Sequence, residues 1–343
     1  MNKIVITGGA GFIGSHIVEH FVNAYPNAEI IVLDKMTYAA DVRNLMHLIS
    51  VNKIRLVVGD ICHLDTCLSA VKGADLVIHA AAESHVDNSF GNSLEFTRTN
   101  VTGTHCLMEA CRSENVAKII HVSTDEVYGE VLEGSATEDT TLKPTNPYSA
   151  SKAAAEMIIS GYLQSYKMPI VMVRANNIFG KRQFPEKIIP KFALNLILGK
   201  PLTIHGNGKN CRHYLSANDF AVALELLVQK GVIGECYNIG TTEEYTNMQM
   251  AYMLCDIFDV DPDKTITFIK DRPFNDQRYA VDWSKITALG WTSQHSLINE
   301  ISDVAQWYYD NADRYVPSAD LKTLNAPSKL GKPSLELSLA KVA

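Results

Sequence analysis

The sequence contains no apolar run that approaches the roughly 18 residues of a membrane span. It also lacks an excess of positive charge, because 31 lysines and arginines stand against 38 acidic residues and give a formal net charge of −7. A broad basic surface for nucleic acid or for an anionic membrane is therefore not expected. We predict neither a nucleic-acid partner nor a membrane partner, and any phosphate group must be bound by a local feature.

The seven cysteines lack the paired C-x-x-C spacing of a zinc or redox site, so no metal site is predicted. At the start of the chain, Met1-Asn2-Lys3 runs directly into Ile4-Val5-Ile6 without the pattern of a signal peptide. Both features predict reduced thiols and a cytoplasmic location.

The 343 residues are 46% apolar and 20% charged, which is typical of a globular protein with one large or two interlocked domains. Short apolar runs alternate with helical patterns through the first half. This alternation predicts an α/β fold with a Rossmann-type doubly wound parallel sheet and ligands at the C-terminal ends of its strands. The expected strands are 3–7, 30–33, 54–58, 76–79, 119–123 and 170–174. The expected helices include 15–23, 93–114, 148–166, 190–198, 218–229 and 248–258.

The pattern changes after about Asn176, where prolines become more frequent. We therefore expect a Rossmann-type domain over residues 1–176 and a smaller mixed α/β lobe over 177–316, with some segments returning to the first domain. Residues 317–343 show no strong period and are predicted to form a flexible tail.

A glycine-rich turn, Thr7-Gly8-Gly9-Ala10-Gly11-Phe12-Ile13-Gly14, follows the first expected strand. Its glycines allow backbone N–H groups to approach a pyrophosphate at the positive end of a helix. Alone, the pattern is equally compatible with an ordinary strand-to-helix turn. Asp34 ends the second strand 20 positions after Gly14, where its carboxylate can accept both hydroxyls of an adenosine ribose.

Together these features predict a dinucleotide site. A 2′-phosphate would meet the like charge of Asp34, so NAD is favoured over NADP, although Lys35 and Arg43 lie nearby. Asp60 ends the third strand, where an acid can face the adenine amino group. The alanines after the fourth strand leave room for a cofactor to cross the sheet edge.

Tyr148 and Lys152 lie four residues apart on an expected helix and therefore share one face. A tyrosine has an ordinary pKa of about 10 and is a poor base at neutral pH, but a neighbouring ammonium group favours its phenolate. Taken alone, the pair is more typical of a solvated helix face. In a chain that also has a predicted dinucleotide site, and with Ser123 and Thr124 ending the fifth strand, the Tyr148–Lys152 pair indicates a proton-transfer site.

These motifs resemble those of the extended short-chain dehydrogenase/reductase family, over about residues 2–316. The resemblance implies that Tyr148 exchanges a proton with a sugar hydroxyl during oxidation by NAD. It also implies that Lys152 supports the tyrosine and holds the nicotinamide ribose, and that Thr124 polarises the substrate oxygen. The NAD-binding residues that we predict are Gly8, Gly11, Phe12, Ile13, Gly14, Asp34, Lys35, Asp60, Ile61, Ala80, Ala81, Ala82, Asn100, Tyr148 and Lys152.

Two consecutive acids, Asp125 and Glu126, follow the fifth strand within S-T-D-E-V-Y-G. A buried carboxylate is costly unless it is paired or used in function, although an acid pair can also simply cap a loop. The seven-residue run resembles that of the nucleoside-diphosphate-glucose 4,6-dehydratases. By that resemblance Glu126 removes the proton from C5 of the hexose and Asp125 protonates the C6 hydroxyl. The predicted catalytic residues are Thr124, Asp125, Glu126, Tyr148 and Lys152.

The same resemblance places residues of both lobes around the substrate. Arginine suits a diphosphate because its planar donor fork matches phosphate oxygens, while a surface ion pair is the alternative for any single arginine. The predicted substrate-binding residues are Ser84, Thr124, Asn177, Glu186, Lys187, Arg212, Asn247 and Arg278.

Two departures from the family pattern concern the nucleotide base. Arg212 is followed by His213 and Tyr214 where the family often has an acid and tryptophan, and residues 271–276 resemble the UDP-glucose dehydratase portion of plant-type rhamnose synthases. The resemblance implies a lyase that converts dTDP-glucose to dTDP-4-keto-6-deoxyglucose, an early step toward rhamnose and other deoxysugars, with UDP-glucose as the alternative substrate. It also implies a homodimer.

Two other functions stay open. A nucleotide-sugar 4-epimerase shares the C4 oxidation but needs no acid pair. A non-catalytic regulator that responds to NAD has no use for Tyr148, Lys152 or the acids.

Overall fold

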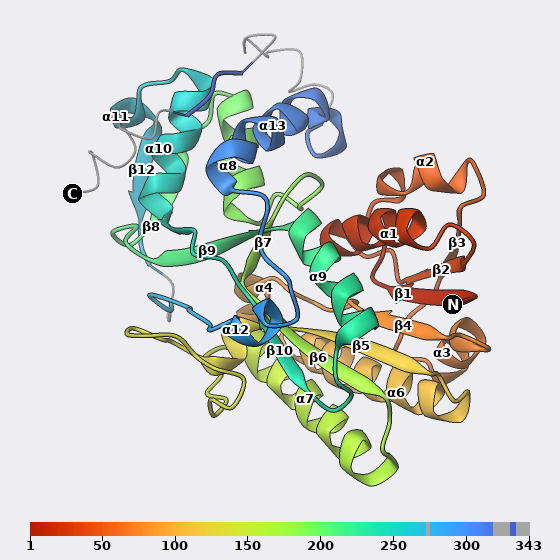
Figure 1. Ribbon diagram of the computed structural model, residues 1–343. Helices are drawn as coiled ribbons and strands as arrows, with labels where there is room; N and C mark the ends of the chain where they lie inside the picture. The colour runs from red at the N-terminus through yellow and green to blue at the C-terminus, as the bar shows by residue number, and fades with distance from the viewer. Residues whose placement is uncertain (272–274, 318–329, 334–343) are drawn as a thin grey trace.

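The structure is a computed structural model that describes residues 1–271, 275–317 and 330–333 (Figure 1). Seven parallel strands form one sheet in the order β10-β6-β5-β4-β1-β2-β3. This arrangement confirms the prediction of a Rossmann-type sheet. The strands are β1 (Lys3–Thr7), β2 (Glu29–Asp34), β3 (Ile54–Val58), β4 (Leu76–His79), β5 (Lys118–Thr124), β6 (Ile170–Ala175) and β10 (Cys236–Ile239).

The central strands are largely buried and mostly apolar because helices cover both faces of the sheet (Figure 1). On β1, Ile4 and Ile6 pack toward one face, whereas Val5 packs toward the other. The first face is covered by α1 (Phe12–Ala24) and α9 (Ala217–Lys230). The opposite face is covered by α3 (Leu64–Val71), α6 (Thr104–Ser113) and α7 (Pro147–Tyr166).

The strand order reverses beside β1. From β1 the chain continues to β2 and β3 on one side, while β4, β5 and β6 follow on the other. A doubly wound sheet opens a crevice at such a point, outside the carboxyl ends of the strands. The fold therefore directs ligands to the edge where β1, β2, β4 and β5 end.

The helix expected over 93–114 is divided into three parts. It begins as α5 (Ser93–Phe96), widens into the π-helical segment η2 (Thr97–Gly103) and continues as α6. Within η2, Asn100 is buried and its side chain bonds both backbone groups of Glu83. The wider turn occurs where the side chain of Asn100 bonds the backbone of the loop that follows β4. Such π-helical turns are frequent at functional sites.

The second lobe has its own apolar core, which contains Phe192, Leu254 and Tyr308. Its main helices are α8 (Ile188–Ile197), α10 (Asn247–Phe258) and α13 (Leu297–Asp310). Its small sheets contain β7 (Asn177–Phe179), β8 (Leu202–His205), β9 (Cys211–Ser216), β11 (Glu244–Thr246) and β12 (Ile266–Ile269). The remaining short helices are η1 (Val42–Asn44), α2 (Met46–Ile49), α4 (Val86–Gly91), η3 (Asp125–Tyr128), α11 (Pro262–Thr265), α12 (Ser284–Thr287) and η4 (Ala312–Arg314).

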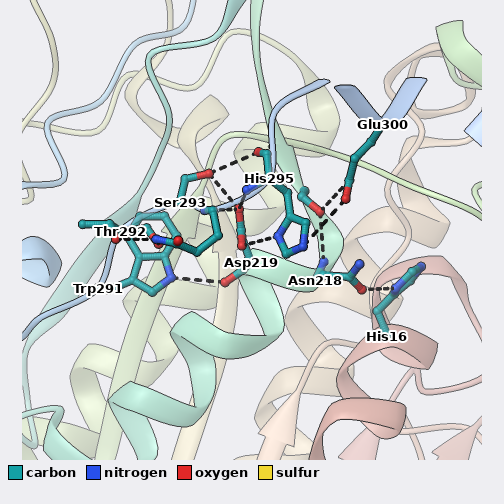
Figure 2. A network of polar contacts seen from close by, with 10 residues as sticks. His16, Asn218, Asp219, Trp291, Thr292, Ser293, His295 and Glu300 are labelled. Atoms are coloured by element: carbon teal, nitrogen blue, oxygen red, sulfur yellow. Dashed lines mark hydrogen bonds and ion pairs between the residues drawn. The ribbon is translucent and has the colours of Figure 1, made fainter. Parts of the chain in front are cut away.

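The chain crosses between the lobes more than once, since α9 and β10 return to the first sheet. A polar network at the start of α9 joins this helix to residues 291–300 (Figure 2). Asp219 is 2% exposed, accepts the backbone N–H groups of Gln294 and His295 at 2.9 Å each, and contacts Nδ1 of His295 at 2.7 Å. Glu300 of α13 lies 3.8 Å from the other side of that imidazole.

Most of the predicted tail lies outside the described residues, which include only Pro317 and 330–333 of it. The N–H of Leu330 donates to Gln306 at 3.0 Å. Among the helices in the described part of the chain, none combines the length and apolar character that crossing a membrane requires.

Candidate active site

A cavity of about 430 Å³ runs along the C-terminal edge of the sheet and into the second lobe. We call one part of it the glycine end, lined by the Gly8–Gly14 turn, Asp34 and Ala80–Ala82. We call the other part the acidic end, lined by Glu126, Tyr148, Lys187, Arg212 and Asp276.

At the glycine end the backbone turns so tightly that side chains are excluded. Gly8 has φ +73°, and a Cβ on it would lie 2.7 Å from Cα of Ala81. A Cβ on Gly14 would lie 2.0 Å from the carbonyl oxygen of Gly8. With α1 beginning at Phe12, the first turn of the helix presents its N–H groups at this position, which suits a pyrophosphate.

Asp34 is held at the end of β2 by two backbone hydrogen bonds. One carboxylate oxygen accepts the N–H of Ala10 at 2.9 Å, and the other accepts the N–H of Met36 at 2.8 Å. Burial raises the pKa of this carboxyl, and the two N–H groups oppose that shift. Each oxygen keeps a lone pair for a ribose hydroxyl. Lys35 forms an ion pair with Asp60 at 3.0 Å.

The structure brings nearly all of the predicted NAD-binding residues to the cavity wall. Asn100 is the exception, because its side chain bonds the backbone of Glu83 and the hydroxyl of Ser151 instead of lining the cavity. The residues that do line it are Gly8, Gly11, Phe12, Ile13, Gly14, Asp34, Lys35, Asp60, Ile61, Ala80, Ala81, Ala82, Tyr148 and Lys152.

Tyr148 is positioned by a strongly capped helix start. Asn146 caps α7 by accepting the N–H of Ser149, whose hydroxyl in turn contacts the N–H of Asn146, and Pro147 occupies the first helical position. This places Tyr148 in the first turn of α7, beside the end of β5. Lys152 follows one turn later, as the sequence predicts.

The pKa of Tyr148 in the structure shifts in the opposite direction from the one expected beside Lys152. The ammonium of Lys152 donates to the carbonyl oxygen of Val122 at 2.7 Å, and burial lowers its pKa to about 8. Burial and the charge of Glu126 raise the pKa of Tyr148 well above its usual value, instead of the expected lowering. Burial disfavours the charged phenolate, the carboxylates of Glu126 and Asp125 repel it, and a hydrogen bond with Thr124 opposes the shift.

The two acids occupy different environments. Asp125 is 3% exposed, accepts from Nδ2 of Asn176 at 2.8 Å, and lies behind the cavity wall. Burial raises its pKa to about 7, and the neighbouring Glu126 adds to that shift. Burial also raises the pKa of Glu126, but Lys187 and Arg212 oppose the shift and Asn146 donates to its carboxylate at 3.3 Å. Adjacent carboxyls in such surroundings can hold one proton between them at neutral pH.

Of the predicted substrate residues, the structure places one away from the cavity. Arg278 pairs with Glu244 at 2.7 Å and donates to the carbonyl oxygens of Val131 and Gly134. Arg278 thus forms an ion pair, which is the alternative to phosphate binding for any single arginine. The pair forms because Glu244 of β11 faces Arg278. The other predicted substrate residues line the cavity: Ser84, Thr124, Asn177, Glu186, Lys187, Arg212 and Asn247.

Sequence reasoning missed three polar residues of the site. Asn176 holds Asp125, and its position directly after β6 was the available signal. Asp276 and Tyr279 line the acidic end. Asp276 ends the run 271–276, which the resemblance relates only to the nucleotide base, so its position near Glu126 and Arg212 was not predicted. For Tyr279, only its contact with Arg212 marks it.

The sheet, the glycine turn and the Tyr148–Lys152 helix are those of an extended short-chain dehydrogenase/reductase. A family profile described as GDP-mannose 4,6 dehydratase matches residues 5–304. The chain belongs to this family of nucleotide-sugar 4,6-dehydratases.

Three similar proteins illustrate the relationship. The chain is 40% identical over 316 residues to the dTDP-D-glucose 4,6-dehydratase of Homo sapiens, with 90% of each chain covered. It is 46% identical over 317 residues to the trifunctional UDP-glucose 4,6-dehydratase/UDP-4-keto-6-deoxy-D-glucose 3,5-epimerase/UDP-4-keto-L-rhamnose-reductase RHM2 of Arabidopsis thaliana, covering 91% of this chain and 48% of that protein. The chain thus spans about half the length of that relative. The crystal structure of DesIV, the dTDP-glucose 4,6-dehydratase from Streptomyces venezuelae, with NAD and TYD bound, superposes with a TM-score of 0.89 at 38% identity and covers 92% of this chain and 99% of that one.

Proposed function

We propose that the protein is an NAD-dependent lyase that converts dTDP-glucose to dTDP-4-keto-6-deoxyglucose and water. The observation that carries this proposal is Glu126 beside Tyr148 in a cavity whose other end is a glycine turn, with the carboxyl of Asp125 next to Glu126 directly behind the cavity wall. The similarity to relatives named dTDP-glucose 4,6-dehydratases supports it.

The glycine end fits a dinucleotide because its tight turn, into which the backbone leaves no room for a Cβ on Gly8 or Gly14, brings the N–H groups at the start of α1 to the cavity, where they suit a pyrophosphate. Asp34 would hold the adenosine ribose, and Lys152 the nicotinamide ribose. When bound, NAD oxidises C4 of the sugar and is restored in the same turnover by reducing C6, so no net redox partner is required. We accordingly assign residues 1–176 to NAD and residues 177–316 to the sugar nucleotide.

Tyr148 takes the proton of the C4 hydroxyl in its phenolate form, which must arise against the burial that raises its pKa, and Thr124 donates to the same sugar oxygen. The ketone at C4 makes the C5 proton acidic, so a carboxylate can remove it. Glu126 takes this proton, a double bond forms between C5 and C6, and the C6–O bond breaks as Asp125 protonates the departing hydroxyl to give water. With a pKa raised to about 7, Asp125 keeps its proton in about half of the molecules at neutral pH, and this protonated form is the one that the step requires. Glu126 later returns its proton to C5.

The acidic end supplies cations for the diphosphate of the substrate. Arg212 extends from β9, and Lys187 lies directly before α8, where its ammonium donates to the carbonyl oxygen of Ser84 at 3.1 Å. UDP-glucose is the second candidate substrate, favoured by the 46% identity to a relative named for UDP-glucose 4,6-dehydratase activity.

The direct test mixes purified protein with dTDP-glucose or UDP-glucose in parallel and follows the 4-keto-6-deoxy product. Turnover of dTDP-glucose is expected, and turnover of UDP-glucose alone would overturn the assignment of the base. A product that keeps its C6 hydroxyl would indicate a 4-epimerase. NAD binding without any product would indicate a regulator.

Replacement of Glu126 by glutamine tests the role of the C5 base. Elimination should slow by about 10²–10⁴-fold, while C4 oxidation persists and the absorbance of the reduced cofactor accumulates. Glu133→Gln at an exposed position is the matched control. Unimpaired elimination in Glu126→Gln would refute the role.

We also propose that the protein is cytoplasmic and forms a homodimer; light scattering of the purified protein tests the dimer. On α6 and α7, Leu107, Met108 and Ile159 are buried against the sheet, whereas Met157 of α7 is 60% exposed and available to a partner.

A further inference from the structure

Asp276 is a buried carboxylate to which the steps above give no role. It is 4% exposed and lines the acidic end together with Glu126. Its two carboxylate oxygens lie 2.9 and 3.0 Å from the hydroxyl of Thr145, and the hydroxyl of Tyr279 donates to the same carboxylate. A buried carboxylate costs folding free energy unless it is hydrogen-bonded, and the hydroxyls of Thr145 and Tyr279 supply these bonds to Asp276.

One arm of this cluster leads to the proposed C5 base. Thr145 directly precedes Asn146, which caps α7 and donates to Oε2 of Glu126 at 3.3 Å. The contact between Asp276 and Thr145 therefore fixes the segment whose Asn146 orients Glu126, whereas Tyr148 lies inside α7 itself.

The other arm leads to the proposed diphosphate site. The guanidinium of Arg212 lies over the ring of Tyr279, 4.6 Å from its centre, and donates to the carbonyl oxygen of Asp276 at 3.0 Å. Residues 276 and 279 thus stand between the cation that would bind the substrate and the carboxylate that would react with it. They lie in the second lobe, whereas Glu126 and Thr145 lie in the first.

We propose that Asp276, Tyr279 and Thr145 form a hydrogen-bonded bridge between the lobes that positions Glu126 for proton removal at C5. This inference rests on the proposed dehydratase function. The three are positioning residues, because they act through Asn146 and Glu126 and not on the sugar itself. The bridge serves the elimination step, so its loss slows elimination more than C4 oxidation.

The charge of Asp276 gives the bridge a measurable signature. Burial raises the pKa of Glu126, Lys187 and Arg212 lower it, and Asp276 raises it. The side chains of Asp125, Tyr148 and Tyr279 also interact with Glu126. Removing the negative charge at position 276 therefore lowers the pKa of Glu126, and the acidic limb of the rate profile moves to lower pH.

The experiment compares Asp276→Asn, Tyr279→Phe, Thr145→Val and Thr145→Ser in the full chain with its cofactor. We expect kcat to fall about tenfold to a hundredfold in the first three, with KM little changed, because a small misplacement of a reacting group costs this much. Thr145→Ser keeps the hydroxyl and should recover most of the rate. Tyr162→Phe is the matched control, since its hydroxyl donates to Glu109 at 2.8 Å and the residue does not line the cavity.

Three readouts separate positioning from a merely structural role. In the first three variants the absorbance of the reduced cofactor should accumulate, C5 should take up solvent deuterium more slowly, and in Asp276→Asn the acidic limb should shift to lower pH. Equal slowing of oxidation and elimination, or an unshifted limb with unchanged kcat, would overturn the inference. If Asp276→Asn does not fold, Tyr279→Phe, which keeps the ring under Arg212, and the Thr145 pair decide the question. A wild-type protein that makes no keto-sugar would instead refute the proposed function.

Discussion

The glycine end of the cavity presents backbone N–H groups and small side chains, whereas the acidic end presents charged side chains that face one another. The glycine end comes from the ends of β1, β2 and β4, within the first 82 residues. The acidic end combines Glu126, Lys187, Arg212 and Asp276, which span 150 positions and both lobes. The difference indicates that a site built from backbone depends on local spacing, while a site built from side chains depends on how distant segments pack.

A single added methyl group should abolish NAD binding at the glycine end. In Gly14→Ala the new Cβ would lie 2.0 Å from the carbonyl oxygen of Gly8, so the turn must open. We expect the free energy of unfolding to fall by about 1–3 kcal/mol and NAD to cease raising the melting temperature. Gly161→Ala in α7 is the control, because a Cβ there meets no atom within 4 Å. A normal NAD-induced shift in Gly14→Ala would contradict the close approach.

The acidic end should respond to loss of one cation through substrate affinity. Arg212→Ala is expected to raise KM about tenfold to a hundredfold, because a hydrogen bond to a charged group contributes about 1.5–3 kcal/mol. Arg278→Ala is the matched comparison, since its ion pair with Glu244 lies away from the cavity wall. Initial rates over a range of substrate concentrations provide the measurement. An equal rise in KM for both variants would place Arg278 at the substrate after all.

The acid pair should give the elimination an alkaline limb. Burial raises the pKa of Asp125 to about 7, so a rising pH removes the proton that it must donate. Above that value kcat should fall about tenfold per pH unit. The same shift lowers stability as pH rises from the ordinary pKa of an aspartate, about 3.9, through the folded value. Asp125→Asn should therefore lose elimination yet unfold less readily at alkaline pH, which denaturant titrations at two pH values can check.

The smallest effect should come from the junction of the lobes in Figure 2. The Asp219 carboxylate raises the pKa of His295 above its ordinary value of about 6.5. The interaction of the protonated imidazole with Asp219 therefore contributes to stability below that ordinary value. This contribution is lost as pH rises through the raised pKa of the folded state. Because the imidazole is 41% exposed, His295→Asn should cost no more than about 1 kcal/mol in acid and less in alkali. The same change at exposed His63 is the control. A cost that is independent of pH would show that the charge does not matter.

Sequence patterns predicted the strands of the first half closely, since β1, β3 and β4 have the expected bounds. They missed β10, a four-residue strand that joins the sheet only because α9 packs beside α1 and delivers it next to β6. They also missed the π-helical segment around Asn100. In this segment the side chain of Asn100 contacts the loop after β4. In both cases the deciding contact lies far away in the chain.

For the site, the sequence by itself determined the glycine turn, Asp34, the Tyr148–Lys152 spacing and the adjacency of Asp125 and Glu126. Each of these features depends on neighbours within one turn or one strand, so the local sequence is enough to predict it. Only the tertiary structure decided that Arg212 enters the cavity while Arg278 does not, and that Asn176 holds Asp125. It also decided that Asp276 and Tyr279 stand beside Glu126. Electrostatic interactions between side chains act through space, so their partners are set by packing and not by position in the chain.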